Sequence, residues 1–421
     1  METILPKKKE QAVLVGVNSG RNRNIEDSME ELEQLVDTAG AEVVSKVVQN
    51  LNSIHPRTYI GKGKAEYVGN LLKELDGSVV IFDNDLTPAQ NRNLEDMFDC
   101  KVLDRTAVIL DIFALHARTN EARLQVELAQ LQYALPRLTR LWVHLAGSQG
   151  GIGFRGPGET QLEVDRRLIG KRISDIGRKL TKVQSQHDIQ RKARGDMLEV
   201  GLVGYTNAGK STLLNALTDA NVYVEDQLFA TLDTTTRQIN LDQNQKALIS
   251  DTVGFIRNLP HSLIASFRAT LAEVRLADLL IHLVDASHPN FRDHISAVNT
   301  ILTELEAFDK PTLMVFNKSD KLQSEYPGDM DFQSEYPESL VISAKTGQGL
   351  AGLRERLLSV LESRLTKETF RIPQRAGHIV DMIHSQANVI KTEYEADSTL
   401  LTAELERPLA DKIRKILNRN S

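Results

Sequence analysis

The sequence has very little cysteine and no long apolar run. Cys100 is the one cysteine among 421 residues, so no disulfide can form within the chain, which is typical of a reducing compartment. The most apolar stretch, LLIHLVDA from Leu279, is too short to span a bilayer. The N-terminal METILPKKKEQ lacks the apolar core of a signal peptide. We therefore expect a cytoplasmic protein that does not insert into a membrane.

A marked excess of charge of either sign is also missing from the chain as a whole. The 51 basic and 57 acidic side chains give a net charge of −6, which excludes a protein that is basic throughout. The charge is uneven, however. Residues 118–195 hold 15 Lys and Arg against 7 Asp and Glu, whereas the rest holds 36 against 50. This favours a polyanion partner for one basic element, with a solvated helical face as the alternative.

Apolar runs separated by amphipathic stretches divide the chain into regions. Residues 1–117 and residues 196–364 each alternate strand-like and helix-like patterns, which predicts two α/β domains, the first with a small parallel sheet. Residues 365–421 predict a small α+β domain. The strands expected in these three regions are 12–17, 41–48, 78–82 and 100–104, then 198–204, 246–250, 279–285, 312–317 and 339–343, then 369–373, 388–396 and 399–405.

Residues 118–195 have a different, helical pattern. Leucines recur at spacings of 4, 3, 4 and 3 from Leu124 to Leu138, and a second apolar series runs from Leu162 to Val183. Each series forms one stripe on a helix, so the two helices are best buried against each other as an antiparallel hairpin. Between them lies GSQGGIGFRGPGE (147–159), whose six glycines and one proline predict a long mobile loop.

A phosphate-binding loop is expected where a strand is followed by GYTNAGKS and a helical pattern. The glycines let backbone N–H groups turn toward phosphates, and the helix adds its positive end. Lys210 is expected to reach the β- and γ-phosphates, and the Ser211 hydroxyl to bind Mg²⁺. The loop candidates are Gly204, Tyr205, Thr206, Asn207, Ala208, Gly209, Lys210 and Ser211.

Two further motifs select guanine over adenine. The Asp320 carboxylate of NKSD can accept two N–H bonds from the guanine edge, whereas adenine would leave the buried charge poorly paired. Asn317 can bond guanine N7, the Lys318 stem can lie over the ring, and SAK places the Ala344 N–H near guanine O6. The base-site candidates are Asn317, Lys318, Ser319, Asp320, Ser343, Ala344 and Lys345.

Between these motifs lie two switch segments. In DTVG, Asp251 is expected to hold Mg²⁺ through water and the Gly254 N–H to meet the γ-phosphate. In FATLDTTTR, spacing alone leaves the second Mg²⁺ ligand open among the threonines at 231, 234, 235 and 236. The catalytic candidates are Lys210 and Gly254. The switch candidates are Phe229, Ala230, Thr231, Leu232, Asp233, Asp251, Thr252, Val253 and Gly254.

With these elements in order, the chain resembles the HflX family of ribosome-associated GTPases. The resemblance is carried by HPRTYIGKGK (55–64), GGIGFRGPGETQLE (150–163), GYTNAGKST, LFATLD, DTVGFI and NKSD. It implies a GTPase domain with a mixed six-stranded sheet and selects Thr231 as the Mg²⁺ ligand. Thr234 stands where relatives usually have proline. The YIGKGK turn is read equally as a helix cap over a phosphate or as a plain strand-to-helix turn.

The resemblance also implies a partner. Members of this family bind the large ribosomal subunit and promote separation of the subunits, so the basic hairpin is expected to face ribosomal RNA. We expect a monomer that exchanges GTP and GDP. An alternative is a GTP-gated scaffold for a protein partner; an ATP-driven RNA enzyme is disfavoured by NKSD and SAK. The RNA-contact candidates are Arg155, Arg166, Arg167, Lys171 and Arg172.

Phe255, which follows the DTVG glycine, cannot orient a water molecule by hydrogen bonding and is expected to pack beneath the second switch. Catalysis then depends on positioning and charge. Mg²⁺ with Lys210 gives a slow basal rate, and the remainder must come from a ribosomal element or a K⁺ ion. Asn207 is the candidate K⁺ ligand; the alternative is that asparagine serves only the backbone conformation of the loop.

Overall fold

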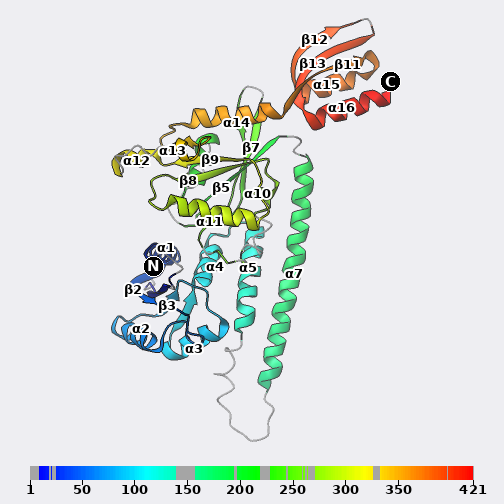
Figure 1. Ribbon diagram of the computed structural model, residues 1–421. Helices are drawn as coiled ribbons and strands as arrows, with labels where there is room; N and C mark the ends of the chain where they lie inside the picture. Colours follow the sequence, from blue (N-terminus) through cyan, green and yellow to red (C-terminus); the bar gives the residue numbers. More distant parts are fainter. Residues whose placement is uncertain are drawn as a thin grey trace, which may run out of the picture. The chain divides into compact units, whose positions relative to one another are not determined.

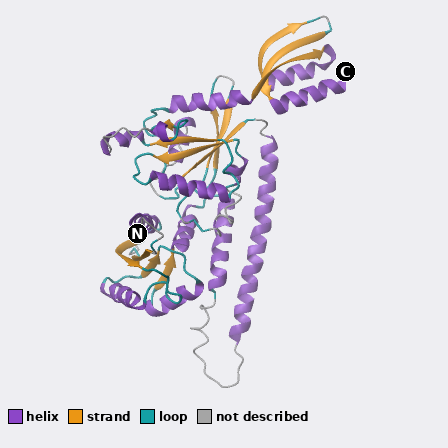
Figure 2. Cartoon of the chain, viewed as in Figure 1, coloured by secondary structure: helices purple, strands orange, loops and turns teal. Residues whose placement is uncertain are grey.

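The computed structural model describes residues 9–18, 20, 25–138, 157–193, 197–218, 228–242, 245–257, 259–260, 263, 271–325, 332–395 and 397–420. Three separate sheets organise these residues (Figures 1 and 2). The chain forms two compact units. The first comprises residues 1–185, 224–233 and 253–272, and the second comprises the remainder. Within the described residues, no helix is long and apolar enough to cross a membrane.

The N-terminal domain of the first unit is built on a four-stranded parallel sheet in the order β2-β1-β3-β4. Alternate side chains of each strand point to opposite faces, so both faces are apolar and both are covered by helices. The strands and helices are β1 (Gln11–Asn18), α1 (Ile25–Thr38), β2 (Glu42–Asn50), α2 (Lys62–Glu74), β3 (Val79–Phe82), α3 (Pro88–Phe98), β4 (Lys101–Asp104) and α4 (Arg105–His116). The parallel α/β domain expected from the sequence is confirmed.

The YIGKGK turn leads into a helix. Gly61 is the N-cap of α2, with no side-chain capping bond, and its N–H donates to Gln49 Oε1 at 3.1 Å. Tyr59 adopts a left-handed backbone, φ 64°, and is buried against Phe82. These contacts describe a turn that starts α2, in which Tyr59 and Ile60 are buried and Lys62 and Gly63 are exposed.

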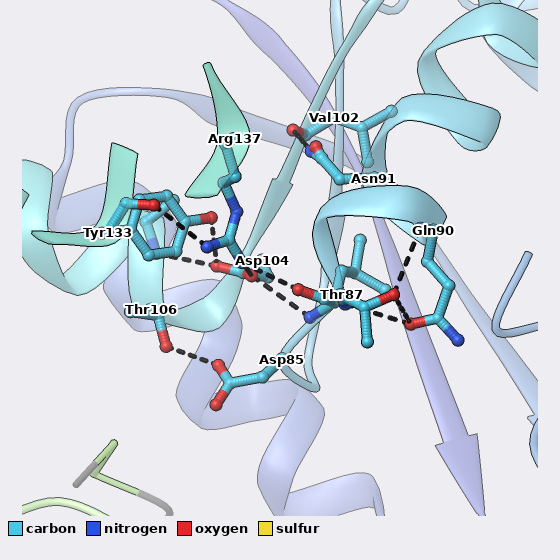
Figure 3. Close-up of polar contacts among 11 residues, drawn as sticks. Asp85, Thr87, Gln90, Asn91, Val102, Asp104, Thr106, Tyr133 and Arg137 are labelled. Atoms are coloured by element: carbon cyan, nitrogen blue, oxygen red, sulfur yellow. Dashed lines mark hydrogen bonds and ion pairs between the residues drawn. The ribbon is translucent and has the colours of Figure 1, made fainter. Parts of the chain in front are cut away.

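A buried carboxylate attaches the helical hairpin to this sheet. Asp104 lies at the carboxyl end of β4 and caps α4, accepting the Ala107 N–H at 3.0 Å. It also accepts hydrogen bonds from Tyr133 Oη at 2.9 Å and from Arg137 Nη2 at 3.2 Å (Figure 3). These bonds bring the end of the first hairpin helix onto the edge of the sheet. The Arg137 guanidinium lies 3.7 Å from the Tyr133 ring centre. Burial and the Asp104 charge raise the pKa of Tyr133, which keeps the phenol a hydrogen-bond donor.

The hairpin itself consists of α5 (Asn120–Ala134), a short 3-10 turn η1 (Leu135–Arg137), and the 37-residue helix α7 (Pro157–Ala193). A bidentate pair between Arg172 and Glu127, at 2.6 and 2.9 Å, joins the two helices. Ile176 is completely buried, and Leu124 is 8% exposed. The two helices of the predicted hairpin are therefore present, and each stripe contains a buried residue.

The glycine-rich loop ends earlier in the chain than its composition predicted. α7 already begins at Pro157, so Pro157–Glu159, expected in the loop, form its first turn. Proline is favoured in the first helical turn because its missing N–H would have no partner there and its φ is already helical. The preceding part of the loop, 147–156, lies outside the described residues.

The second unit contains a six-stranded sheet in the order β10-β9-β8-β5-β7-β6. Five strands are parallel, and β6 is antiparallel to β7 at the edge, which confirms the mixed six-stranded sheet. Helices α8 and α14 pack on one face and α11 on the other. The elements are β5 (Leu198–Gly204), α8 (Lys210–Thr218), β6 (Thr235–Asn240), β7 (Lys246–Asp251), α10 (Ala272–Leu276), β8 (Leu279–Asp285), α11 (Phe291–Glu304), β9 (Thr312–Asn317), α12 (Ser319–Glu325), α13 (Phe332–Glu335), β10 (Leu340–Val341) and α14 (Leu350–Arg364).

A small α+β domain follows α14. Its three strands are antiparallel in the order β11-β13-β12, and two helices cover the apolar face formed by residues such as Phe370 and Leu401. The elements are β11 (Leu365–Pro373), η2 (Gln374–Ala376), α15 (Gly377–Gln386), β12 (Asn388–Tyr394), β13 (Ser398–Glu406) and α16 (Arg407–Asn420). The final domain expected from the sequence is confirmed.

Candidate nucleotide-binding site

The loop between β5 and α8 has the backbone of a phosphate cradle. Gly209 has φ 94°, and a Cβ there would lie 2.4 Å from Asn317 Nδ2. A Cβ on Gly204 would lie 2.3 Å from the Leu283 carbonyl oxygen. Neither position therefore tolerates a side chain. Asn207 is also left-handed, φ 59°, a conformation that asparagine adopts more readily than most residues.

Lys210 begins α8 and is 6% exposed. Its Nζ donates to the carbonyl oxygens of Gly204 at 3.1 Å and Tyr205 at 2.9 Å, so the ammonium lies inside the loop. Burial lowers its pKa to about 8, although the Asp251 charge acts in the opposite direction. A buried, poorly hydrated cation of this kind is well suited to bind a phosphate.

The two Mg²⁺ ligands expected in this unit lie together. Ser211 Oγ donates to Asp251 Oδ2 at 2.6 Å. A hydroxyl and a carboxylate are hard oxygen donors, which Mg²⁺ prefers when it also binds phosphate oxygens. Among the described residues, no group of three or more His, Cys, Asp or Glu side chains could hold a metal ion.

Asn317 connects the base motif to the phosphate loop. Its Nδ2 donates to the Ala208 carbonyl at 2.8 Å, and its Oδ1 accepts the Ala344 N–H at 2.9 Å. The Ala344 N–H, expected near guanine O6, donates here to Asn317. An amide has two N–H donors, so a contact from Asn317 to guanine N7 would use the second.

Asp320 and Ser343 form the other side of the base motif. Ser343 Oγ donates to Asp320 Oδ1 at 2.6 Å, and the same hydroxyl accepts the Thr346 N–H at 3.2 Å. The Ser319 N–H donates to the Ile342 carbonyl, which holds the start of α12 against the strand before SAK. The two motifs, 23 residues apart, are thus brought to one place with the Asp320 carboxylate oriented by a hydroxyl.

The first switch segment packs in the first unit. Asp233 accepts the N–H groups of Arg118 and Thr119, at 3.1 and 3.3 Å, and the Thr119 hydroxyl at 2.6 Å. Phe229 is 2% exposed, with its ring centre 4.8 Å from that of Phe113. The segment next to Thr231 is therefore held by the start of α5 and by α4.

The neighbouring threonines lie in a different environment. The sequence left Thr231, Thr234, Thr235 and Thr236 open as the Mg²⁺ ligand. The last two belong to the edge strand β6, and Thr236 Oγ1 bonds Ser250 Oγ at 2.8 Å. This strand was not located by the apolar pattern, because its sequence, TTRQIN, is mostly polar. Strand pairing commits Thr235 and Thr236 to the sheet.

The second switch segment begins where β7 ends. Thr252 is completely buried and donates its hydroxyl to the Leu202 carbonyl at 2.6 Å, which fixes the chain beside β5. Val253 and Phe255 are also buried, Phe255 being 1% exposed. A buried phenyl ring agrees with the packing role expected for Phe255 and leaves Gly254 as the backbone donor candidate.

The RNA-contact candidates on α7 differ in their environment. Arg166, Arg167 and Lys171 are exposed. Arg172 is committed to Glu127, and Arg155 lies outside the described residues. Leu168, beside the two arginines, is 57% exposed.

Three residues near the site were not identified as candidates from the sequence: His282, His294 and Asp285. His282 on β8 is 1% exposed, and burial, with a smaller effect of the Lys210 charge, lowers its pKa to about 4, so it is neutral. The Tyr205 ring stacks on His294 with centres 3.8 Å apart. Asp285 pairs with Lys318: burial would raise its pKa, but the Lys318 charge and the bonds from Lys318 and Ser287 lower it overall. The sequence did carry a signal for Asp285, because this charged residue ends the apolar run LLIHLVD.

Comparison with protein families agrees with this geometry. Three models match in succession: GTP-binding GTPase N-terminal over residues 26–114, GTP-binding GTPase Middle Region over 116–194, and 50S ribosome-binding GTPase over 199–318. The GTPase HflX of Escherichia coli (strain K12) is 44% identical over 404 residues, covering 96% of this chain and 94% of that protein. The chain belongs to the HflX family of GTPases.

Another HflX relative and a solved structure are also similar to this chain. The GTPase HflX of Flavobacterium psychrophilum is 50% identical, covering 74% of this chain and 76% of that protein. A GTP-binding protein from Sulfolobus solfataricus, solved in complex with GDP, is 25% identical with a TM-score of 0.44, covering 83% of this chain and 98% of that one. This HflX-family chain is a GTPase with a P-loop domain.

Proposed function

We propose that this HflX-family GTPase is a cytoplasmic monomer that binds the large ribosomal subunit in its GTP form and promotes separation of the ribosomal subunits. The observation that carries the proposal is the exposed basic face of α7, in a chain whose P-loop GTPase domain matches a family model described as a 50S ribosome-binding GTPase. Hydrolysis to GDP would end the interaction.

The chain's own residues account for a slow basal reaction. Lys210 would place its charge on the β- and γ-phosphates, and the Gly254 N–H would meet the γ-phosphate. Ser211 and Asp251, with Thr231 from the first switch, would hold Mg²⁺, whose charge offsets that of the phosphates. Phe255 is buried and has no hydrogen-bonding group to orient water. A ribosomal element that orders the switches would therefore accelerate hydrolysis.

Removing the exposed positive charges of α7, which we call the α7 arm (Arg166, Arg167 and Lys171), should weaken binding to the ribosome. The triple variant Arg166→Gln, Arg167→Gln, Lys171→Gln loses three charges that attract phosphates. Its affinity for purified large subunits should therefore fall at least about tenfold. Hydrolysis without ribosomes should stay within about twofold of the original rate, because no phosphate-loop residue changes. Co-sedimentation and GTP turnover with and without large subunits measure both effects.

A matched control removes three exposed charges elsewhere. Lys367→Gln, Lys412→Gln, Lys415→Gln in the C-terminal domain changes the net charge equally. It should leave ribosome binding nearly unchanged if the α7 arm is the contact. Unchanged binding by the arm variant would instead favour a GTP-gated scaffold for a protein partner, with contact made by apolar side chains such as Leu168.

Potassium dependence separates the two roles considered for Asn207. If Asn207 helps to hold K⁺ beside the phosphates, hydrolysis should be about tenfold faster in K⁺ than in Na⁺ buffer. Asn207→Gly keeps the left-handed backbone, so it should bind GTP but lose this preference. Equal rates in the two buffers would assign Asn207 to the loop conformation alone.

A further inference from the structure

The Lys318 ammonium is held by a carboxylate that none of the nucleotide motifs contains. Lys318 Nζ lies 2.7 Å from Asp285 Oδ2, and the two side chains are 19% and 18% exposed. The other oxygen, Oδ1, accepts the N–H and the hydroxyl of Ser287 at 3.0 and 2.7 Å. Asp285 is therefore fixed on one side by Ser287 and binds Lys318 on the other.

Sheet register explains why these residues meet. Asp285 ends β8 and is the register partner of Asn317, which ends the parallel strand β9. The Ala286 N–H donates to the Asn317 carbonyl at 3.0 Å, so the strand ends stay aligned. Lys318 follows in a left-handed conformation, φ 66°. This places Asp285 at the carboxyl edge of the sheet, where open α/β sheets bind ligands.

We propose that Asp285 is a positioning residue for guanine-nucleotide binding, because it holds the Lys318 side chain in the orientation in which its stem covers the base. The inference rests on the proposed guanine site at NKSD and SAK. A lysine stem has several rotatable bonds, and fixing it before the nucleotide arrives removes an entropic cost from binding. The ion pair is four-fifths buried, unlike most surface pairs, which contribute little.

The proposal predicts a loss of affinity rather than of chemistry. Asp285→Asn keeps the shape and the Ser287 contacts but removes the charge, so dissociation constants for GTP and GDP should rise about tenfold. Lys318 would contact the base and not the reacting phosphate, so turnover at saturating GTP should change less than about twofold. Fluorescence titration and turnover at several GTP concentrations measure both.

The same strand offers a matched control. Asp278 precedes β8, accepts the Glu199 N–H at 2.9 Å and pairs with Arg364 at 2.8 Å, at the opposite end of the strand. Asp278→Asn removes an ion pair of similar length, although a more exposed one, and should leave both dissociation constants within about twofold of the original. Equal losses in the two variants would overturn the proposal and indicate a general effect on the sheet.

A double-mutant cycle tests the mechanism independently of stability. In Lys318→Met the stem remains but the ammonium is gone, so adding Asp285→Asn should cause no further loss of affinity. Additive losses would show that Asp285 does not act through Lys318. If the unaltered protein bound no guanine nucleotide, the proposed function would fail; if it bound normally and Asp285→Asn did too, only this inference would fail.

Discussion

Lys210→Met is expected to reduce GTP hydrolysis about a thousandfold, the size of effect seen when a charge-stabilising group is removed from an acyl- or phosphoryl-transfer site. The Lys210 ammonium is the buried cation of the phosphate loop, and methionine fills a similar volume without charge. Binding of nucleotide should weaken as well, because the β- and γ-phosphates lose their counter-charge. Single-turnover hydrolysis and nucleotide titration separate the two losses.

The thermal stability of the Lys210→Met protein should stay equal or increase. Burial already lowers the pKa of Lys210 to about 8, which means that the charged form is disfavoured where it lies, and a buried charge replaced by an apolar group of similar size is often neutral or stabilising. Lys310→Met is a suitable control for removing a lysine that donates to a backbone carbonyl, because Lys310 donates to the carbonyl of Ala277 at 2.7 Å, outside the phosphate loop. It should leave GTP hydrolysis nearly unchanged. Hydrolysis retained by Lys210→Met to within tenfold would contradict the assignment.

Asp320→Asn should exchange guanine for xanthine specificity. The carboxylate is expected to accept two N–H bonds from guanine; an asparagine amide presents a donor where guanine also presents donors. GTP affinity should therefore fall by about two to four orders of magnitude, as for other sites left with unpaired polar groups. Xanthine carries an oxygen at this edge, so XTP should bind the variant better than GTP. Competition between the two nucleotides provides the measurement.

The structure suggests why this variant should still fold. Ser343 donates its hydroxyl to Asp320 Oδ1, and the oxygen of an asparagine side chain can accept the same bond. Ser343→Ala would then give a smaller loss of GTP affinity with no gain for XTP, because it disturbs the orientation of Asp320 without changing its hydrogen-bonding pattern. An Asp320→Asn protein with unaltered GTP preference would rule out the base site at NKSD.

Local patterns were sufficient for the architecture. The parallel N-terminal sheet, the two hairpin helices and the C-terminal α+β domain were all predicted from apolar periodicity, and the structure confirms them. Periodicity works here because each strand or helix must bury one or both faces wherever it lies. It failed for β6, because the sequence of that strand, TTRQIN, is mostly polar. It also placed the end of the glycine-rich loop three residues too late, at Glu159.

Contacts between distant segments could not be predicted in the same way. Asp233 was assigned to the switch from its motif, yet its carboxylate binds the backbone of Thr119, 114 residues away. The pairing of Asp285 with Lys318 likewise depends on the register of two strands. No local pattern encodes such a meeting, because it results from how whole elements pack.

The order and spacing of GYTNAGKS, DTVG, NKSD and SAK, each at the end of an apolar strand, were enough to identify a GTPase, because parallel strands bring their carboxyl ends to one edge. Folding in three dimensions decided which partner each polar atom has: Asn317 between the phosphate loop and SAK, Asp285 on Lys318, and Asp233 at the start of α5. A hydrogen bond requires two atoms within about 3 Å of each other, and only the packed chain sets that distance.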